Sequence, residues 1–248
     1  MISVCMAAYN GEKFIRQQLL SILKQLNPED EVIVSDDGST DKTLEIIQSF
    51  NDSRIKILHH KSDKRLLKRS LGNYMVVAQN FENALLHASG DIIVMSDQDD
   101  LWDSDRIERI KKDLSSNLLV MVNYQIIDEN DIKQGIIGYD SSPIYQNWFL
   151  NVLKSRFMCC CLAYRKQLLP YILPFPKDLK SCDQWIGCNA SKYGKINFIN
   201  DVYHLYRRHG KNVSSTSEQS SNSLFIKIIF RLNLLYNLNK NFINKRGI

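Results

Sequence analysis

The sequence of 248 residues contains no apolar run of the roughly 20 residues that a membrane-spanning helix needs. Its first residues, Ile2–Met6, are strand-like, so we expect no signal peptide. The six cysteines form no Cys-x-x-Cys pair, and the five histidines are not spaced to complete a zinc site. We therefore expect a cytoplasmic protein whose thiols are buried and reduced.

Acidic residues are slightly outnumbered, since 32 Lys and Arg face 27 Asp and Glu, which gives a formal net charge of +5. The basic residues gather in Lys61–Arg69 and in the C-terminal tail. This bias suits a polyanionic partner such as a diphosphate or an anionic membrane surface. It is too weak to indicate nucleic acid as a partner, and no zinc-finger or RNP-type pattern is present.

Strand and helix patterns alternate through residues 1–128, which predicts an α/β fold with a doubly wound, mainly parallel, Rossmann-like sheet. The predicted strands are Ile2–Ala7, Glu31–Ser35, Arg54–His59, Asp91–Met95 and Leu118–Ile127. Helical spacing of apolar residues predicts helices over 15–26, Thr43–Phe50, Tyr74–Ala88 and Asp103–Leu114.

The second half is less regular, so residues 129–215 are expected to form a mixed, acceptor-side half of one domain that spans residues 1–215. We expect a loop over Asp128–Tyr145 and a polar, basic segment over Tyr203–Asn212. The pattern predicts strands at Phe157–Arg165 and Ile196–Ile199 and helices at Gln146–Lys154, Gln167–Leu173 and Asp183–Tyr193. Residues 216–248 are expected to hold the end of a serine-rich linker, Ser214–Ser223, and a C-terminal helix.

The acidic cluster Ser96–Asp100 follows a buried strand and gathers three carboxylates at one point. Clustered carboxylates repel each other, and a divalent cation with oxygen ligands would remove that penalty. A solvated acidic turn is the alternative. An EF-hand is excluded, because Trp102 stands at the sixth position, where the calcium loop needs glycine.

Two further carboxylate groups also lie at the ends of predicted elements. The turn Asp36–Ser39 lacks the Gly-x-Gly-x-x-Gly dinucleotide motif. It either caps a helix or offers a carboxylate to a base or ribose. Asp183 starts a predicted helix, and the choice there lies between a cap and a functional group.

Taken in order, six segments resemble family 2 glycosyltransferases of the GT-A fold, and the second half resembles their rhamnosyltransferase-like branch. The resemblance covers residues 2–215. It rests on Met6–Gly11, Ser35–Asp41, Gly90–Trp102, Cys182–Trp185, Lys192–Ile196 and Tyr206–Ser214. The chain departs from the branch at Cys159 and Gln184, where a small residue and an aromatic residue are usual, so an acceptor preference does not transfer.

The resemblance implies roles for the matching positions. Ala8 and Tyr9 would line the nucleotide pocket, with Asp36 or Asp37 on the base and ribose. Asp97 would face the donor diphosphate and, with Asp99, hold Mg²⁺ or Mn²⁺. Asp183 would be the general base. The residues expected near the diphosphate are Arg207, Arg208 and His209. One base without an enzyme nucleophile implies inversion at the anomeric carbon.

The C-terminal segment Leu224–Phe242 reads as a basic amphipathic helix. Such a helix would lie on an anionic membrane and place the protein at the inner face of the cytoplasmic membrane. The alternative is a helix packed on its own domain or on a second subunit, as in a homodimer. The residues behind this reading are Phe225, Lys227, Ile228, Ile229, Arg231, Leu232, Leu235, Leu238, Lys240 and Lys245.

These features together predict a metal-dependent inverting glycosyltransferase. It would move a sugar from a nucleoside-diphosphate donor, a UDP- or dTDP-sugar, to a glycan or polyprenyl-linked acceptor in bacterial surface polysaccharide synthesis. A catalytically inactive, sugar-nucleotide-binding or scaffolding subunit is the alternative. A pyrophosphorylase would need a Gly-rich basic loop after the first strand, and Met6–Gly11 has none.

Overall fold

The computed structural model describes residues 1–69, 71–154, 156–210, 212 and 224–245. Within them a nine-stranded sheet has the order β3-β2-β1-β4-β8-β6-β9-β5, with β7 paired to β6. The strands are β1 Ile2–Ala8, β2 Glu31–Asp36, β3 Ile55–His59, β4 Ile92–Ser96, β5 Leu101–Trp102, β6 Leu119–Ile127, β7 Lys133–Ile137, β8 Leu162–Arg165 and β9 Ile196–Arg207.

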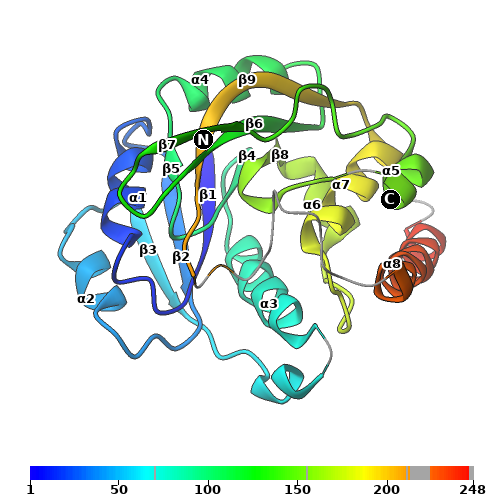
Figure 1. The fold of residues 1–248 in the computed structure, drawn as a ribbon, viewed down its shortest axis with the longest axis horizontal. Coiled ribbons are helices and arrows are strands. Elements are labelled where there is room, and N and C mark those ends of the chain that lie inside the picture. Colours follow the sequence, from blue (N-terminus) through cyan, green and yellow to red (C-terminus); the bar gives the residue numbers. More distant parts are fainter. Residues whose placement is uncertain (70, 155, 211, 213–223, 246–248) are drawn as a thin grey trace.

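Helices pack against this sheet, and α5, α6, α7 and α8 gather on one side of the molecule (Figure 1). The α-helices are α1 Ile15–Leu23, α2 Thr43–Gln48, α3 Gly72–Leu86, α4 Arg106–Leu114, α5 Trp148–Lys154, α6 Leu169–Ile172, α7 Cys182–Tyr193 and α8 Leu224–Asn244. Short 3₁₀ helices are η1 Lys64–Lys68, η2 Cys159–Cys161 and η3 Lys166–Leu168.

The first four strands of the sheet order form the parallel part of the fold. β1 pairs in parallel with β2 and β4, and β2 pairs in parallel with β3. Helices α1 and α2 lie on one side of these strands and α3 on the other (Figure 1). Because both faces are covered, β1 and β2 are apolar along most of their length and buried throughout their centres.

The second half is mixed, and with the parallel first half it confirms the predicted fold class. β8 is antiparallel to both β4 and β6, whereas β9 is parallel to β6 and antiparallel to β5. The predicted loop Asp128–Tyr145 contains an unpredicted strand, β7, whose residues are all exposed. Its pattern Lys-Gln-Gly gives no apolar alternation that a sequence reading could detect.

β9 is the largest departure from the predicted elements. It continues from Ile196 to Arg207 and so includes the first half of the polar, basic segment Tyr203–Asn212, for which no strand was predicted. Pairing with both β6 and β5 holds its polar half in the sheet. The predicted strand Phe157–Arg165 is shorter, because its centre, Cys159–Cys161, is a 3₁₀ turn.

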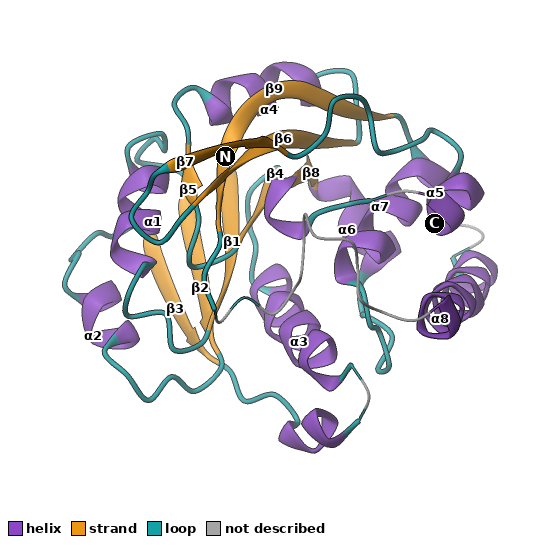
Figure 2. Cartoon of the chain, in the orientation of Figure 1, coloured by secondary structure: helices purple, strands orange, loops and turns teal. Residues whose placement is uncertain are grey.

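Helix α8 packs on its own domain against α5 and α7 (Figure 2). Leu234 and Leu238 are buried in this contact. None of the described helices is long and apolar enough to cross a membrane. The predicted linker Ser214–Ser223 lies outside the described residues.

Candidate functional site

The carboxyl ends of β1, β2 and β4 meet at one rim of the sheet. Ala8 lies opposite Asp36 in the β1–β2 pairing, and Met6 lies opposite Ser96 in the β1–β4 pairing. Asp37 and Asp97 follow directly, so the first two acidic groups come together as expected. Open α/β sheets bind ligands at this rim.

Tyr9 and the loop after β1 are fixed by a residue of the acidic cluster. The side chain of Gln98 accepts a hydrogen bond from the Tyr9 amide and donates one to the Tyr9 carbonyl, both at 2.9 Å. A Cβ at Gly11 would lie 2.3 Å from Gln98 Oε1, so a larger residue there would displace the Gln98 amide from its contact with the Tyr9 loop. The Tyr9 side chain remains 50% exposed and offers a ring for stacking.

Asp36 and Asp37 are both buried but have different partners. Asp36 accepts from the amides of Gly38 and Ser39 at 3.1 and 3.0 Å and so shapes its own turn. Asp37 accepts from the Ser62 amide at 2.7 Å and from Lys64. Lys64 also lies 4.9 Å from the centre of the Tyr9 ring. Asp37 thus joins the basic segment to the Tyr9 loop, whereas Asp36 serves mainly its own turn.

In the cluster Asp97, Asp99 and Asp100, the charges lie close together; Asp100 is buried, and Asp97 and Asp99 are half-buried. Burial raises the pKa of Asp97 well above its usual range, and the charges of Asp100 and Asp99 raise it further. Burial also raises the pKa of Asp100 to about 8, with a further contribution from Asp99. Asp99 faces His209, whose Nε2 lies 2.9 Å from Asp99 Oδ2. The ionised forms of Asp97 and Asp100 are therefore disfavoured by the protein alone.

Arg207 reaches the acidic cluster in a way that the sequence did not predict. Its side chain is fully buried, and its Nε donates to the Asp99 carbonyl at 2.7 Å. The rest of the guanidinium contacts Asp131, Gln17 and the Asp128 carbonyl. Contact with a diphosphate would require breaking these bonds, so the geometry favours a positioning role for Arg207.

The next two residues, Arg208 and His209, contact other parts of the protein. The amide of Arg208 donates to the Ile127 carbonyl at 2.9 Å, and its side chain is partly exposed. The ring of His209 lies 5.0 Å from that of Phe14. This end of β9 therefore lies beside Asp99, at the rim where the resemblance places the diphosphate.

Asp183 lies in the first turn of α7, in the second half of the chain. Its Oδ1 accepts from Ser181 Oγ at 2.5 Å and from the Gln184 amide at 2.7 Å. Burial raises the pKa of Asp183, although these hydrogen bonds oppose the shift. Its charge also acts on Asp97, so the two carboxyl groups share one electrostatic environment. A base that is easily protonated suits general base catalysis.

The described geometry has counterparts among known proteins. The model of Glycosyl transferase family 2 matches residues 3–171. The chain belongs to this family. It is 32% identical to the UDP-Glc:alpha-D-GlcNAc-diphosphoundecaprenol beta-1,3-glucosyltransferase WfgD of Escherichia coli, over 87% of this chain and 80% of WfgD. The dTDP-rhamnosyl transferase RfbG of Shigella flexneri is 35% identical over 42% of this chain and 34% of RfbG.

A solved structure confirms the predicted GT-A fold. The TarS 1–349 fragment of S. aureus in complex with UDP-GlcNAc superimposes with a TM-score of 0.67 at 20% identity, over 97% of this chain and 69% of the fragment. The chain spans 36% of the longer TarS chain. This glycosyltransferase thus has the fold and family that its sequence predicts.

Two carboxyl groups of the glycosyltransferase, Asp97 and Asp100, would suit a hard divalent cation, whereas Asp99 is not in the group of ligand atoms that these described residues bring together. Asp99 and Asp100 each face a histidine, but no described lysine, arginine or histidine forms an ion pair with Asp97. Ligand atoms of Asp97, Asp100 and Cys160 lie within 4.8 Å of one another. Carboxylate oxygens suit Mg²⁺ or Mn²⁺, whereas a thiol does not. A cation would also favour the ionised forms of Asp97 and Asp100, because burial raises the pKa values of these two groups.

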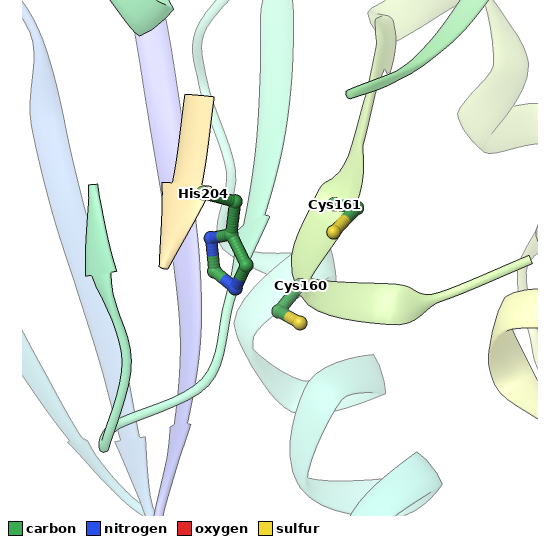
Figure 3. A group of neighbouring side chains, drawn as sticks. All are labelled: Cys160, Cys161 and His204. Atoms are coloured by element: carbon green, nitrogen blue, oxygen red, sulfur yellow. The ribbon is translucent and has the colours of Figure 1, made fainter. Parts of the chain in front are cut away.

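A second cluster, Cys160, Cys161 and His204, has metal-like spacing but another use (Figure 3). His204 Nδ1 lies 2.6 Å from an Arg106 nitrogen, and its Nε2 lies 2.9 Å from Asp100 Oδ2. Both ring nitrogens therefore have protein partners. Burial raises the pKa of Cys160, which keeps its thiol neutral. The cluster supports Asp100 by hydrogen bonding and leaves no ring nitrogen for a metal.

Asp100 accepts from the Arg207 amide at 2.9 Å as well, so it holds the end of β9 beside the acidic cluster. Sequence reasoning assigned no role to Gln98, Lys64 or His204. Gln98 stands inside the acidic cluster, and Lys64 lies in the basic segment Lys61–Arg69. For Gln98 and Lys64, their places in these two segments were the only indications of a role that the sequence offered. Nothing local marks His204, because its partners Asp100 and Arg106 are about 100 residues away in the chain.

Proposed function

We propose that this family 2 enzyme is a metal-dependent, inverting glycosyltransferase that uses a UDP- or dTDP-sugar donor. Its acceptor would be a glycan or polyprenyl-linked glycan in bacterial surface polysaccharide synthesis, at the inner face of the cytoplasmic membrane. The observation that carries this proposal is one half-buried carboxylate, Asp183, within electrostatic reach of the Asp97–Asp100 cluster. Such a pairing fits a proton acceptor opposite a diphosphate site.

The donor nucleotide would bind at the rim formed by the carboxyl ends of the parallel strands. The exposed ring of Tyr9 can stack on a base, with Asp37 and Lys64 beside it. Asp97 and Asp99 would hold Mg²⁺ or Mn²⁺, which neutralises developing charge on a leaving diphosphate. WfgD and RfbG carry UDP-Glc and dTDP-rhamnosyl in their names, which supports this choice of donor.

The transfer step rests on the residues around that site. The acceptor hydroxyl would give its proton to Asp183 as it attacks the anomeric carbon, and the bond to the diphosphate would break on the opposite face. Arg208 and His209 would approach the departing diphosphate, while Arg207 holds the segment in place. Because Asp97 and Asp99 serve the diphosphate, Asp183 is left as the single base, and a single displacement inverts the anomeric carbon.

The test is nucleoside diphosphate release from UDP-, dTDP- and GDP-sugars, with Mn²⁺ or with EDTA, in the presence of a polyprenyl-diphosphate-linked GlcNAc acceptor. We expect Asp183→Asn to lower turnover by about 10²–10⁴-fold while UDP binding persists in a thermal shift assay. Asp99→Ala should lose both turnover and Mn²⁺-dependent UDP binding.

Asp91→Asn is the matched control, because the Asp91 side chain is 86% exposed near the opposite end of β4. Full turnover by Asp183→Asn would contradict the assigned base. Donor binding by the unsubstituted protein with no turnover on any acceptor would favour the alternative, a binding or scaffolding subunit.

A further inference from the structure

The apolar residues of α8 divide between two faces, and only one of them packs on the domain. Leu234 and Leu238 are buried, and Asn241 donates to the Tyr171 carbonyl at 2.7 Å and to Asn189 at 2.8 Å. Asn233 is also bonded to the domain, at Asp178. The helix is therefore fixed on its domain through one side.

The opposite side of α8 exposes large apolar side chains. Leu232 is 60% exposed, Tyr236 66% and Ile243 62%. With Ile229, these residues follow a spacing of three, four and seven, so they form one stripe along the helix. Burying such a stripe in water-free surroundings would be favourable, and the domain does not do so.

Helix α5 lies beside α8 (Figure 2). Its Trp148 ring contacts Phe242 of α8, with ring centres 5.0 Å apart. Phe149, Leu150 and Leu153 of α5 are exposed, at 37–44%. A groove joins the two helices, and its lining residues are Trp148, Lys192, Tyr193, Asn239, Phe242, Ile243 and Lys245.

The charged residues within α5 and α8 are all basic. The sequences of α5 and α8 contain no Asp or Glu. Lys154, Arg231 and Lys240 are exposed on these helices, and Lys192 of α7 lies over the Phe242 ring at 5.5 Å. Anionic lipid headgroups attract such a rim while their acyl chains accept the apolar stripe. A second copy of the chain would instead bring an identical cationic rim against it.

We infer that the exposed faces of α5 and α8 form one docking surface for an anionic lipid bilayer. The two helices would lie in the interface with their apolar residues below the headgroups and their cations at the phosphate level. This inference stands apart from the identity of the donor and acceptor, because adsorption to lipid is measured without turnover.

The experiment is co-sedimentation of the protein with phosphatidylcholine vesicles that contain or lack phosphatidylglycerol. We expect binding to the anionic vesicles only, weakened by salt. The double variant Leu232→Ser, Tyr236→Ser should bind on the order of tenfold more weakly or worse, and Phe149→Ser should also lose affinity. Each of Arg231→Gln and Lys240→Gln should cost about fivefold at low salt.

The control variants carry equivalent changes elsewhere on the surface. Leu86→Ser removes an apolar side chain of α3 that is 61% exposed, and Lys111→Gln removes an exposed cation of α4. Both should bind like the unsubstituted protein. The inference is overturned by equal binding to neutral vesicles, by no binding to either kind, or by variants of the surface that bind unchanged. A solution dimer that Leu232→Ser, Tyr236→Ser dissociates would overturn it in favour of a second copy.

Discussion

Asp100 is buried and Asp183 half-buried, and the hydrogen bonds of these two carboxyl groups fit them for different tasks. Asp100 has His204 on one oxygen and the Arg207 amide on the other. Both oxygens of Asp100 are thus committed to the protein. Asp183 receives both of its bonds from described residues on Oδ1, which leaves Oδ2 for a proton. This difference is why we assign orientation to Asp100 and proton transfer to Asp183.

The bond from Ser181 makes the role of Asp183 testable through pH. The Ser181 hydroxyl donates to the carboxylate and so lowers the pKa of Asp183, against the effect of burial. Removing it in Ser181→Ala should raise that pKa further. Since the base must be ionised, the acid limb of the pH profile of kcat/KM should move to higher pH, with the alkaline limb unchanged. Ser191→Ala, also on α7, is the control, and an unmoved acid limb would contradict the assignment.

At the scale of elements, α8 shows how one helix can serve two surfaces. Its polar contacts with the domain come from asparagines spaced four residues apart, Asn233, Asn237 and Asn241. Between them Leu234 and Leu238 fill the apolar contact. The stripe that we assign to lipid lies on the other side, so docking on the domain leaves that stripe accessible.

The two sides of α8 should respond differently to the same substitution. Leu238 is fully buried, and Leu238→Ala should lower the free energy of unfolding by about 2–5 kcal/mol. Leu232 is 60% exposed, and Leu232→Ala should change it by less than about 0.5 kcal/mol. Urea denaturation, with hydrogen exchange of α8 to detect local detachment, would check this. Equal effects of the two variants would show that the helix is packed through another face.

At the scale of the whole molecule, the hydrogen bonds of one buried acid, Glu31, join the amino ends of the parallel strands. Glu31 of β2 accepts from Ser3 of β1 at 2.5 Å and from Lys56 of β3 at 2.6 Å. Ser89, just before β4, donates to it through its hydroxyl at 2.7 Å. Burial would raise the pKa of Glu31, but these bonds outweigh it and lower the pKa from 4.5 to about 2.

This acid should give the fold a measurable dependence on low pH. The folded pKa lies below the unfolded one, so the unfolded state binds more protons between about pH 2 and 4.5. Stability from Glu31, on the order of 3 kcal/mol, is complete above this window and is lost as pH falls through it. Glu31→Gln should flatten the decline of Tm over this range, whereas Glu29→Gln, an exposed change, should not. Parallel declines in the two variants would contradict the assignment.

The sequence by itself determined the parallel part of the fold and the place of the rim. Strands such as Ile2–Ala8 are apolar along most of their length, and the carboxylates Asp36 and Asp97 each follow such a run after one serine, so both signals are local. The same locality explains why α3 and α4 were predicted within a few residues of their bounds.

Only the tertiary structure decided the contacts that join distant segments. β9 extends to Arg207 because β6 and β5 pair with it. The hydrophobic pattern of its second half does not predict this pairing. Arg207 is buried against Asp99, and His204 bridges Asp100 and Arg106, through bonds that span about 100 residues of chain. The two faces of α8 likewise became distinct only through packing, because a helical pattern gives the spacing of apolar residues but not which of them the domain covers.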